Sequence, residues 1–352
     1  MHPESKAILL AGALIGVLTL VIWRWGVPFV IESPGPTFNV LGNNDAGQPI
    51  VQIDGTTSFP DNGTLRMVTV SVTSPQQTMS LPQAMLSWLT PGNALFPYAD
   101  YYQNSATTAD ETAQGQIQMV TSQDSAIAAA LTELGYTYTQ QVGVIYVTPN
   151  DPSDGLLKAK DEILAVNGTK ITDPQQFTDV LHAYKPGDTV TLEYQRAGKT
   201  GKVDIKLGAS PDHPSVPWLG IYIGVTYQFP ITVTINVDPS IGGPSAGLVL
   251  SLAIYDQLTP GSLVGDIPVA GTGTISPDGK VGPIGGIQQK IRAASEAGAT
   301  LFLVPPDDCA DALGAQPVRP ITLVKAPTMQ SAIDSIKAYV ANPNASLPRC
   351  TP

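Results

Sequence analysis

The stretch Asp238-Pro-Ser-Ile-Gly-Gly-Pro-Ser-Ala-Gly247 directly precedes an apolar run, 248–258, that has the length and composition of a buried helix. Its two adjacent glycines allow the backbone to turn tightly, and Pro244 fixes φ at the entry to the helix. Ser245 is therefore expected at a helix N-terminus, where unpaired backbone N–H groups and the helix dipole favour developing negative charge.

A second stretch, Val281-Gly-Pro-Ile-Gly-Gly-Ile-Gln-Gln-Lys290, has the same design. Its paired glycines interrupt the chain and predict a helix over 287–297 that carries Lys290 in its first turns. A serine needs a base before it can attack a carbonyl carbon. A buried lysine can serve, because desolvation lowers its pKa by up to roughly 3–5 units. The two stretches predict a Ser245–Lys290 dyad, with backbone N–H groups of Gly243 to Ala246 as oxyanion donors.

A third motif, Val269-Ala-Gly-Thr-Gly-Thr-Ile275, lies between these two stretches. The three motifs in this order resemble the proteolytic domain of Lon-type serine proteases, and together they are far more specific than one glycine-rich turn. The resemblance implies that Ser245 is the nucleophile of a serine endopeptidase and that Lys290 is its base. It further implies that Thr272 supports the lysine.

Residues 140–209 have a different pattern and resemble a PDZ domain of the bacterial protease type. The most specific piece is Ile163-Leu-Ala-Val-Asn-Gly168 with Ile171, which is followed by an amphipathic helix, 173–183, and a hairpin. PDZ domains bind an extended peptide or C-terminus as an added strand, so the resemblance implies protein or peptide substrates. The alternative is a PDZ fold that only packs within the chain. The residues assigned to peptide binding are Val142, Gly143, Val144 and Ile145.

The N-terminal run 7–23 contains no charged residue. A helix needs about 20 predominantly apolar residues to span a bilayer, and Trp23 and Trp25 are placed as interfacial residues. The alternative is a cleaved signal peptide, but no convincing small-x-small cleavage site follows the run. We therefore expect an uncleaved single-pass anchor in the cell membrane, with the catalytic part extracytoplasmic. The resemblance to Lon-type and PDZ domains implies a prokaryotic surface protein.

The composition narrows the chemistry further. The net charge of −11 disfavours a nucleic-acid partner. The positions of the three histidines fit neither a metal site nor a Ser-His-Asp triad. No metal or cofactor is therefore expected. Gly198-Lys-Thr200 lacks the first glycine of a phosphate loop, so we expect cleavage without ATP. Cys309 and Cys350 either form one disulfide or remain two free thiols.

These segments predict an α+β chain in which a PDZ β-barrel-like domain interrupts a Lon-type proteolytic domain, preceded by one transmembrane helix. The expected boundaries are 1–30 for the anchor, 31–49 for an extended connector, 50–139 and 210–341 for the two parts of the proteolytic domain, 140–209 for the PDZ domain and 342–352 for a tail. Within the first part, 96–115 is expected to form a long loop. The resemblance to Lon-type domains also implies a homo-oligomer, by analogy a hexamer.

The predicted function is that of a membrane-anchored, ATP-independent serine endopeptidase that cleaves extracytoplasmic proteins recruited or gated by its PDZ domain. Two positions depart from the family pattern. The acidic residue common just before Gly-Pro-Ser is Gly242 here, and the glutamate of the Thr-Gly-Glu motif is Thr274. These departures leave open a different class of function, a membrane-tethered PDZ scaffold whose protease fold is inactive or only processes itself.

Overall fold

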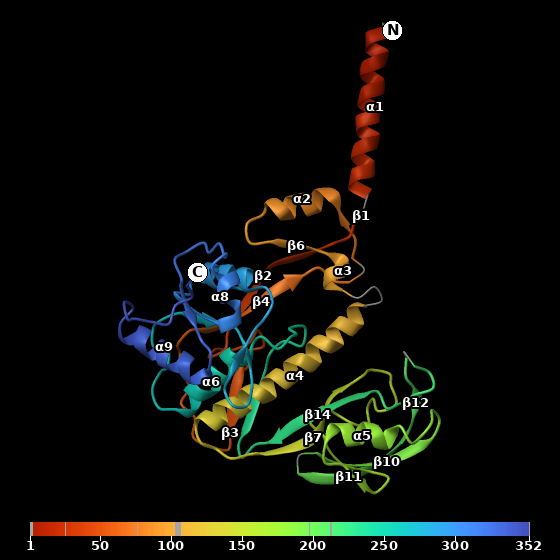
Figure 1. Ribbon diagram of the computed structural model, residues 1–352, viewed down its shortest axis with the longest axis vertical. Coiled ribbons are helices and arrows are strands. Elements are labelled where there is room, and N and C mark those ends of the chain that lie inside the picture. The colour runs from red at the N-terminus through yellow and green to blue at the C-terminus, as the bar shows by residue number, and fades with distance from the viewer. Residues whose placement is uncertain are drawn as a thin grey trace.

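The computed structural model describes residues 3–24, 26–75, 77–102, 107–196, 198–211 and 213–351. Figure 1 shows an N-terminal helix that projects from a mixed α/β body, and a smaller β-rich body at the opposite end of the molecule. The mixed body contains the stretches around Ser245 and Lys290, and the smaller body contains most of the segment expected to be a PDZ domain.

Helix α1 (Pro3–Arg24) covers the uncharged run that the sequence predicts to be an anchor. Its large apolar side chains from Leu10 to Trp23 are exposed. Among the residues described, no helix is long and apolar enough to cross a membrane. Trp25, which was expected at a membrane interface, lies outside the described residues.

A six-stranded sheet forms the centre of the larger body, in the order β20-β19-β16-β4-β2-β6. The strands are β2 (Phe29–Asn39), β4 (Leu65–Val72), β6 (Ala94–Pro97), β16 (Val269–Gly271), β19 (Leu301–Val304) and β20 (Thr322–Lys325). Strands β4, β16, β19 and β20 are parallel, whereas β2 runs antiparallel to both its neighbours. Residues from before and after the predicted PDZ segment thus share one sheet.

Strand β2 corrects the expectation that residues 31–49 form an extended connector. It lies inside the sheet, between β4 and β6, and Glu32 is buried there. The Pro34-Gly-Pro36 segment favoured a connector because proline cannot donate a ladder hydrogen bond. The structure accommodates it with a shift in register between Pro34 and Thr37.

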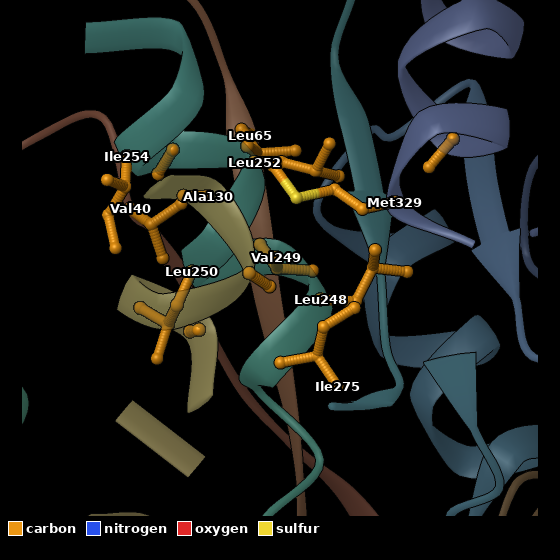
Figure 2. Close-up of a cluster of buried hydrophobic side chains, with 14 of the residues drawn as sticks. Val40, Leu65, Ala130, Leu248, Val249, Leu250, Leu252, Ile254, Ile275 and Met329 are labelled. Carbon is orange, nitrogen blue, oxygen red and sulfur yellow. The ribbon is translucent and has the colours of Figure 1, made fainter. Parts of the chain in front are cut away.

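Three helices pack together beside this sheet: α4 (Thr108–Glu133), α6 (Gly247–Leu258) and α9 (Met329–Ala341). Helix α6 is apolar on every side, which is typical of a helix buried all round. Figure 2 shows its leucines at 248, 250 and 252 among Ala130 of α4, Leu65 of β4 and Met329 of α9. Burial of one such side chain contributes about 1.5–3 kcal/mol. This core therefore fixes the start of α6, directly after Ser245.

The β-rich body contains a second sheet, in the order β11-β10-β8-β7-β14, with the short β9 beside β8. The strands are β7 (Thr139–Val147), β8 (Glu162–Val166), β9 (Thr169–Lys170), β10 (Thr189–Arg196), β11 (Lys199–Lys206) and β14 (Ile221–Gln228). With helix α5 (Pro174–Leu181) they enclose a separate core around Val144, Phe177 and Leu192.

Strand β14 corrects the expected end of the PDZ domain at residue 209. Residues 221–228 were expected to belong to the second part of the proteolytic domain, 210–341, but β14 pairs with β7 along its whole length, from Ile221 to Gln228. Alternation predicts a strand and one buried face, but it does not identify the partner strand.

The stretch 96–115 is mostly regular structure and not the long loop expected. Strand β6 is followed by helix α3 (Tyr98–Tyr101), and α4 begins at Thr108, where Thr107 and Asp110 form a capping box. Residues 103–106 of this stretch lie outside the described residues.

The remaining elements are short, apart from two helices. They are β1 (Gly26–Val27), β3 (Val51–Asp54), β5 (Met79–Ser80), α2 (Leu81–Leu89), β12 (Gly208–Ala209), β13 (Pro217–Trp218), β15 (Thr232–Ile235), β17 (Thr274–Ile275), β18 (Val281–Gly282), α7 (Ile287–Glu296), the 3₁₀ turn η1 (Pro306–Asp308) and α8 (Cys309–Ala312). Cys309 is bonded to Cys350, and this disulfide ties α8 to the C-terminal segment.

Candidate active site

Ser245 lies at the end of the loop that leads into α6. Gly243 has a φ of 93°, a conformation that side chains rarely adopt, and α6 begins at Gly247 with Ala246 as its N-cap. Helix α4 holds this loop from the other side. The N–H of Gly243 donates to the carbonyl of Gly115 at 2.9 Å, and the hydroxyl of Ser122 donates to the carbonyl of Pro244 at 2.8 Å.

Thr272 follows β16 and is 1% exposed. Its hydroxyl donates to the carbonyl oxygen of Ser245 at 3.1 Å, and the N–H of Gly273 donates to the same oxygen at 2.9 Å. The resemblance assigned Thr272 to supporting the lysine. In the structure this hydrogen bond fixes the backbone of the serine, and support of the lysine by Thr272 stays a prediction.

Lys290 lies one turn into α7, as the sequence predicts, and is 3% exposed. The helix begins after Gly286, whose φ of 66° makes the turn out of the preceding strand. Burial lowers the pKa of Lys290 from its ordinary value of 10.5 to about 8, and nearby carboxyl groups oppose part of that fall. The neutral amine is therefore accessible near physiological pH, as a general base requires.

Two acidic residues near Lys290 were not identified from the sequence. Glu32 comes from β2, and Asp308 comes from η1, where its carboxylate accepts a hydrogen bond from the N–H of Ile284 at 3.1 Å. A signal for Glu32 did exist, because it is the one acidic residue between Glu4 and Asp45 and sits in an apolar run. Because that run was assigned to a connector, Glu32 was not considered as a site residue.

Ser245 and Lys290 line the same cavity, which has a volume of about 240 Å³. Its other walls come from β4 over residues 67–71, from Met119 of α4, and from the loop before Ser245, including Gly242. A Cβ at Gly242 would lie 2.9 Å from the Cα of Gly115, so a side chain there has no room. The cavity therefore offers a hydroxyl and a buried amine beside the backbone of a strand.

A groove of about 440 Å³ adjoins this cavity, and both share Met119 and Ile241 in their walls. The groove lies where three parts of the molecule meet: α4, the loop 237–241, and the β-rich body through Ile145 to Val147 and Leu157 to Ala159. A chain segment lying in the groove would therefore be next to Ser245.

The four residues assigned to peptide binding lie within β7, which corrects that assignment. Strand β7 is an interior strand, paired with β14 on one side and with β8 at Gly143 on the other. Val142, Val144 and Ile145 are buried, and a Cβ at Gly143 would lie 2.4 Å from the hydroxyl of Thr226. The strand at the edge of the sheet, beside α5, is β14. Of the four residues, Ile145 lines the groove next to the serine.

Within the described ranges, no group of three or more His, Cys, Asp and Glu side chains is placed to hold a metal ion.

Comparison with known families agrees with the two-part organisation. Residues 237–319 match the family of the Lon protease (S16) C-terminal proteolytic domain, and residues 116–207 match the PDZ domain family. The first match includes Ser245, Thr272 and Lys290.

Curated relatives are similar over part of their length. The chain is 36% identical over 174 residues to the Lon protease of Dictyoglomus thermophilum, covering 47% of this chain and 21% of the relative. It is 31% identical over 109 residues to the Lon protease of Mycolicibacterium smegmatis, covering 28% of this chain and 14% of the relative. The chain thus spans about a fifth or less of the length of these two relatives.

Among solved structures, the PDZ domain of an SdrC-like protein from Listeria monocytogenes is 33% identical, covering 24% of this chain and 86% of that one, with a TM-score of 0.22. The motifs, the shared cavity and the family matches agree: the chain contains a segment similar to PDZ domains, 116–207, and a segment similar to the proteolytic domain of Lon (S16) proteases, 237–319.

Proposed function

We propose that this protein is an ATP-independent serine endopeptidase in which Ser245 is the nucleophile and Lys290 is the general base. The observation that carries the proposal is that a serine beside a helix N-terminus and a buried lysine, with its pKa lowered to about 8, line one cavity. A lysine that serves only solubility is normally exposed and charged.

In the proposed mechanism, neutral Lys290 accepts the proton of the Ser245 hydroxyl while the serine oxygen attacks the carbonyl carbon of the scissile peptide bond. The tetrahedral intermediate carries a negative oxygen. The N–H of Gly243 is already bonded to Gly115, so the oxyanion donors come from the N–H groups of Ser245 or Ala246 at the start of α6.

The peptide C–N bond then breaks, and the departing amine takes the proton from the Lys290 ammonium. This leaves an ester between Ser245 and the acyl part of the substrate. Water attacks the ester with Lys290 again as base, and the carboxylate product leaves with the serine restored. Each proton taken by Lys290 is thus returned within the cycle.

Substrates in this proposal are unfolded segments, loops or chain ends that reach the cavity without an ATP-driven unfolding step. The PDZ domain recruits or gates them. Two features support this role: the PDZ residues Leu157 to Ala159 line the groove next to Ser245, and β14 presents a sheet edge beside α5.

The proposal places the protein in the cell membrane, with the catalytic part extracytoplasmic. Support comes from the uncharged run 7–23 and from the exposed apolar side chains along α1, such as Leu10, Leu14 and Trp23. The disulfide between Cys309 and Cys350 fits an oxidising compartment. By its likeness to Lon-type domains, the active form is further proposed to be a homo-oligomer.

The test compares surface-protein fragments by mass spectrometry in cells that carry the wild type or Ser245→Ala at matched abundance. We expect a set of peptide ends to disappear in the variant while their intact parents accumulate. Purified wild type should cleave a loosely folded protein without ATP, and the variant should be slower by at least about a thousandfold. Identical fragment profiles under several stresses would overturn the proposal and favour the PDZ scaffold.

A further inference from the structure

Glu32 is a buried carboxylate that the mechanism above does not use. It lies on β2, an interior strand of the main sheet, and is 6% exposed. Within the described part of the chain, no hydrogen bond or direct ion pair satisfies its oxygens. Burial of an ionised carboxylate costs free energy unless an opposite charge compensates for it. The cation that interacts with Glu32 therefore indicates the role of its carboxylate.

The carboxylate of Glu32 packs against the start of the helix that carries Lys290. A Cβ on Gly286 would lie 2.7 Å from its Oε1 and 2.6 Å from Cγ1 of Val70, so only glycine fits at this helix start. The N–H of Lys290 donates to the carbonyl of Gly286 at 3.0 Å. The Glu32 carboxylate thus lies against Gly286, one helical turn before the base.

Lys290 is the cation whose charge acts on Glu32. Burial raises the pKa of Glu32, and Lys290 opposes that rise. In the other direction, Glu32 is the larger of two acidic influences that oppose the fall in the pKa of Lys290. Among the described residues, Tyr101 of α3 also interacts with Glu32; its pKa is raised to about 12 chiefly by burial and then by Glu32.

Two other positions near Lys290 could carry a negative charge, but neither replaces Glu32. Asp308 also acts on Lys290, but its carboxylate is committed to the N–H of Ile284. The loop that carries Ser245 has glycine at 242, where the backbone of Gly115 leaves no room for a side chain. The larger acidic influence on Lys290 therefore comes from across the site, on β2.

We propose that Glu32 is a positioning residue for Lys290: its ionised carboxylate stabilises the ammonium that forms when Lys290 takes the proton of Ser245. The proposal rests on the proposed function of the Ser245–Lys290 pair. The proton moves from the serine Oγ to the lysine Nζ and later to the leaving amine, while Glu32 remains ionised throughout. Preorganised charge placed where a charge develops lowers the barrier of the step that creates it.

The test measures kcat against pH for the wild type, Glu32→Gln, Glu32→Asp and Glu296→Gln. Glu296 is the control because it ends the same helix and pairs with Arg292 on the surface. Loss of the Glu32 charge is expected to lower the plateau of kcat about tenfold. The acidic limb, where kcat rises with pH, is expected to move to lower pH by about one unit. Glu32→Asp should keep the wild-type limb, and Glu296→Gln should match the wild type throughout.

A structural role for Glu32 predicts a different result. Glu32→Gln would then lose activity equally at every pH or lose near-ultraviolet circular dichroism, with no movement of the limb. Either of these results, or an unchanged profile, overturns the proposal.

A second measurement does not depend on activity. The Lys290 side chain is titrated by NMR of ¹³Cε-labelled lysine in Ser245→Ala, with and without Glu32→Gln, and Lys290→Arg assigns the signal. The proposal expects the Lys290 midpoint to fall by about one pH unit when Glu32 is neutralised, and no movement refutes it. If Ser245→Ala cleaves as fast as the wild type, the protease proposal fails, and the NMR titration still decides whether Glu32 controls Lys290.

Discussion

At the residue scale, the burial of Lys290 determines the pH at which it can act. At a pKa of about 8, half of the amine is neutral at pH 8, whereas an ordinary lysine with a pKa near 10.4 is less than about 1% neutral. Because the neutral form is the proposed base, kcat is expected to rise with pH through about 8 and level off above it. Steady-state hydrolysis of a peptide from about pH 6 to pH 10 checks this. A flat profile would show that Lys290 is not the base.

Lys290→Arg supplies the companion variant. A guanidinium keeps its proton throughout this pH range, so the variant is expected to lose activity at every pH. An active arginine variant would contradict the proposed role of the lysine.

The second residue-scale prediction concerns Thr272, which donates to the carbonyl of Ser245. Thr272→Val removes this hydrogen bond and keeps the volume, while Gly273 still donates to the same oxygen. A single hydrogen bond contributes about 1 kcal/mol, so kcat should fall about fivefold. Thr272→Ser keeps the hydroxyl and should retain more activity. A larger loss in Thr272→Ser, which lacks the methyl group, than in Thr272→Val would show that methyl packing, and not the bond, is responsible.

At the scale of elements, the contact between α4 and the loop before Ser245 is a backbone-to-backbone contact. Gly242→Ala places a Cβ 2.9 Å from the Cα of Gly115, so one of the two backbones must move. Overpacking of this kind costs about 1–3 kcal/mol. We expect a lower unfolding temperature and a loss of activity, because the displaced loop carries Ser245, the proposed nucleophile.

Gly285→Ala is the matched control for this prediction. Neither Gly242 nor Gly285 has a positive φ, and a Cβ at Gly285 meets nothing within 4 Å. The control should therefore unfold at the wild-type temperature or slightly above it. Equal destabilisation by both substitutions would indicate that backbone entropy, and not crowding against α4, determines the effect.

The sequence predicts some elements well because their determinants are local. Helices α6 and α7 begin where paired glycines and apolar periodicity place them, within one residue of the expected starts. Strand β2 was not predicted because Pro34 and Pro36 are unusual inside a strand. The structure accommodates them with a shift in register between Pro34 and Thr37. Strand β14 was assigned to the proteolytic domain and not to the PDZ domain because its partner, β7, lies far away in the sequence.

Some residues of the candidate site could likewise be predicted from local sequence, and others could not. Ser245 and Lys290 stand out because each is attached to a recognisable motif. Glu32 does not, because its relation to Lys290 exists only after β2 and α7 pack together. Local patterns therefore predict the reacting groups, whereas tertiary packing supplies the charges that set their pKa values.

At the scale of the whole molecule, the groove between the PDZ domain and α4 leads toward Ser245. Ala159 is exposed on the PDZ side of the groove. Ala159→Trp is expected to fill the groove and lower kcat/KM for a protein substrate about tenfold, while a short peptide that occupies only the cavity is cleaved as before. Ala183→Trp, exposed after α5, is the control. Equal rates for the protein substrate in both variants would exclude the groove as part of its path.

The last prediction concerns α2, which has an unusual distribution of side chains. Its small residues Ala84 and Ser87 face the protein, whereas Leu86 and Trp88 are 68% and 74% exposed. Helix α2 contacts α1, and Figure 1 places both at the end of the molecule away from the PDZ sheet. If α1 enters the membrane as proposed, α2 should lie in the interface, where tryptophan and apolar side chains are stabilised.

A spin label can test this directly, because the two native cysteines are bonded to each other and an added thiol is labelled alone. In the full chain reconstituted in zwitterionic bilayers, a label at Leu86→Cys should be more accessible to oxygen than to a water-soluble nickel complex. A label at Lys206→Cys, on the exposed surface of β11, should show the reverse. If Leu14→Cys in α1 contacts lipid but Leu86→Cys contacts water, the anchor stands and interfacial burial of α2 is wrong. Shielding at Leu86 that depends on protein concentration would instead indicate contact with a second copy of the chain.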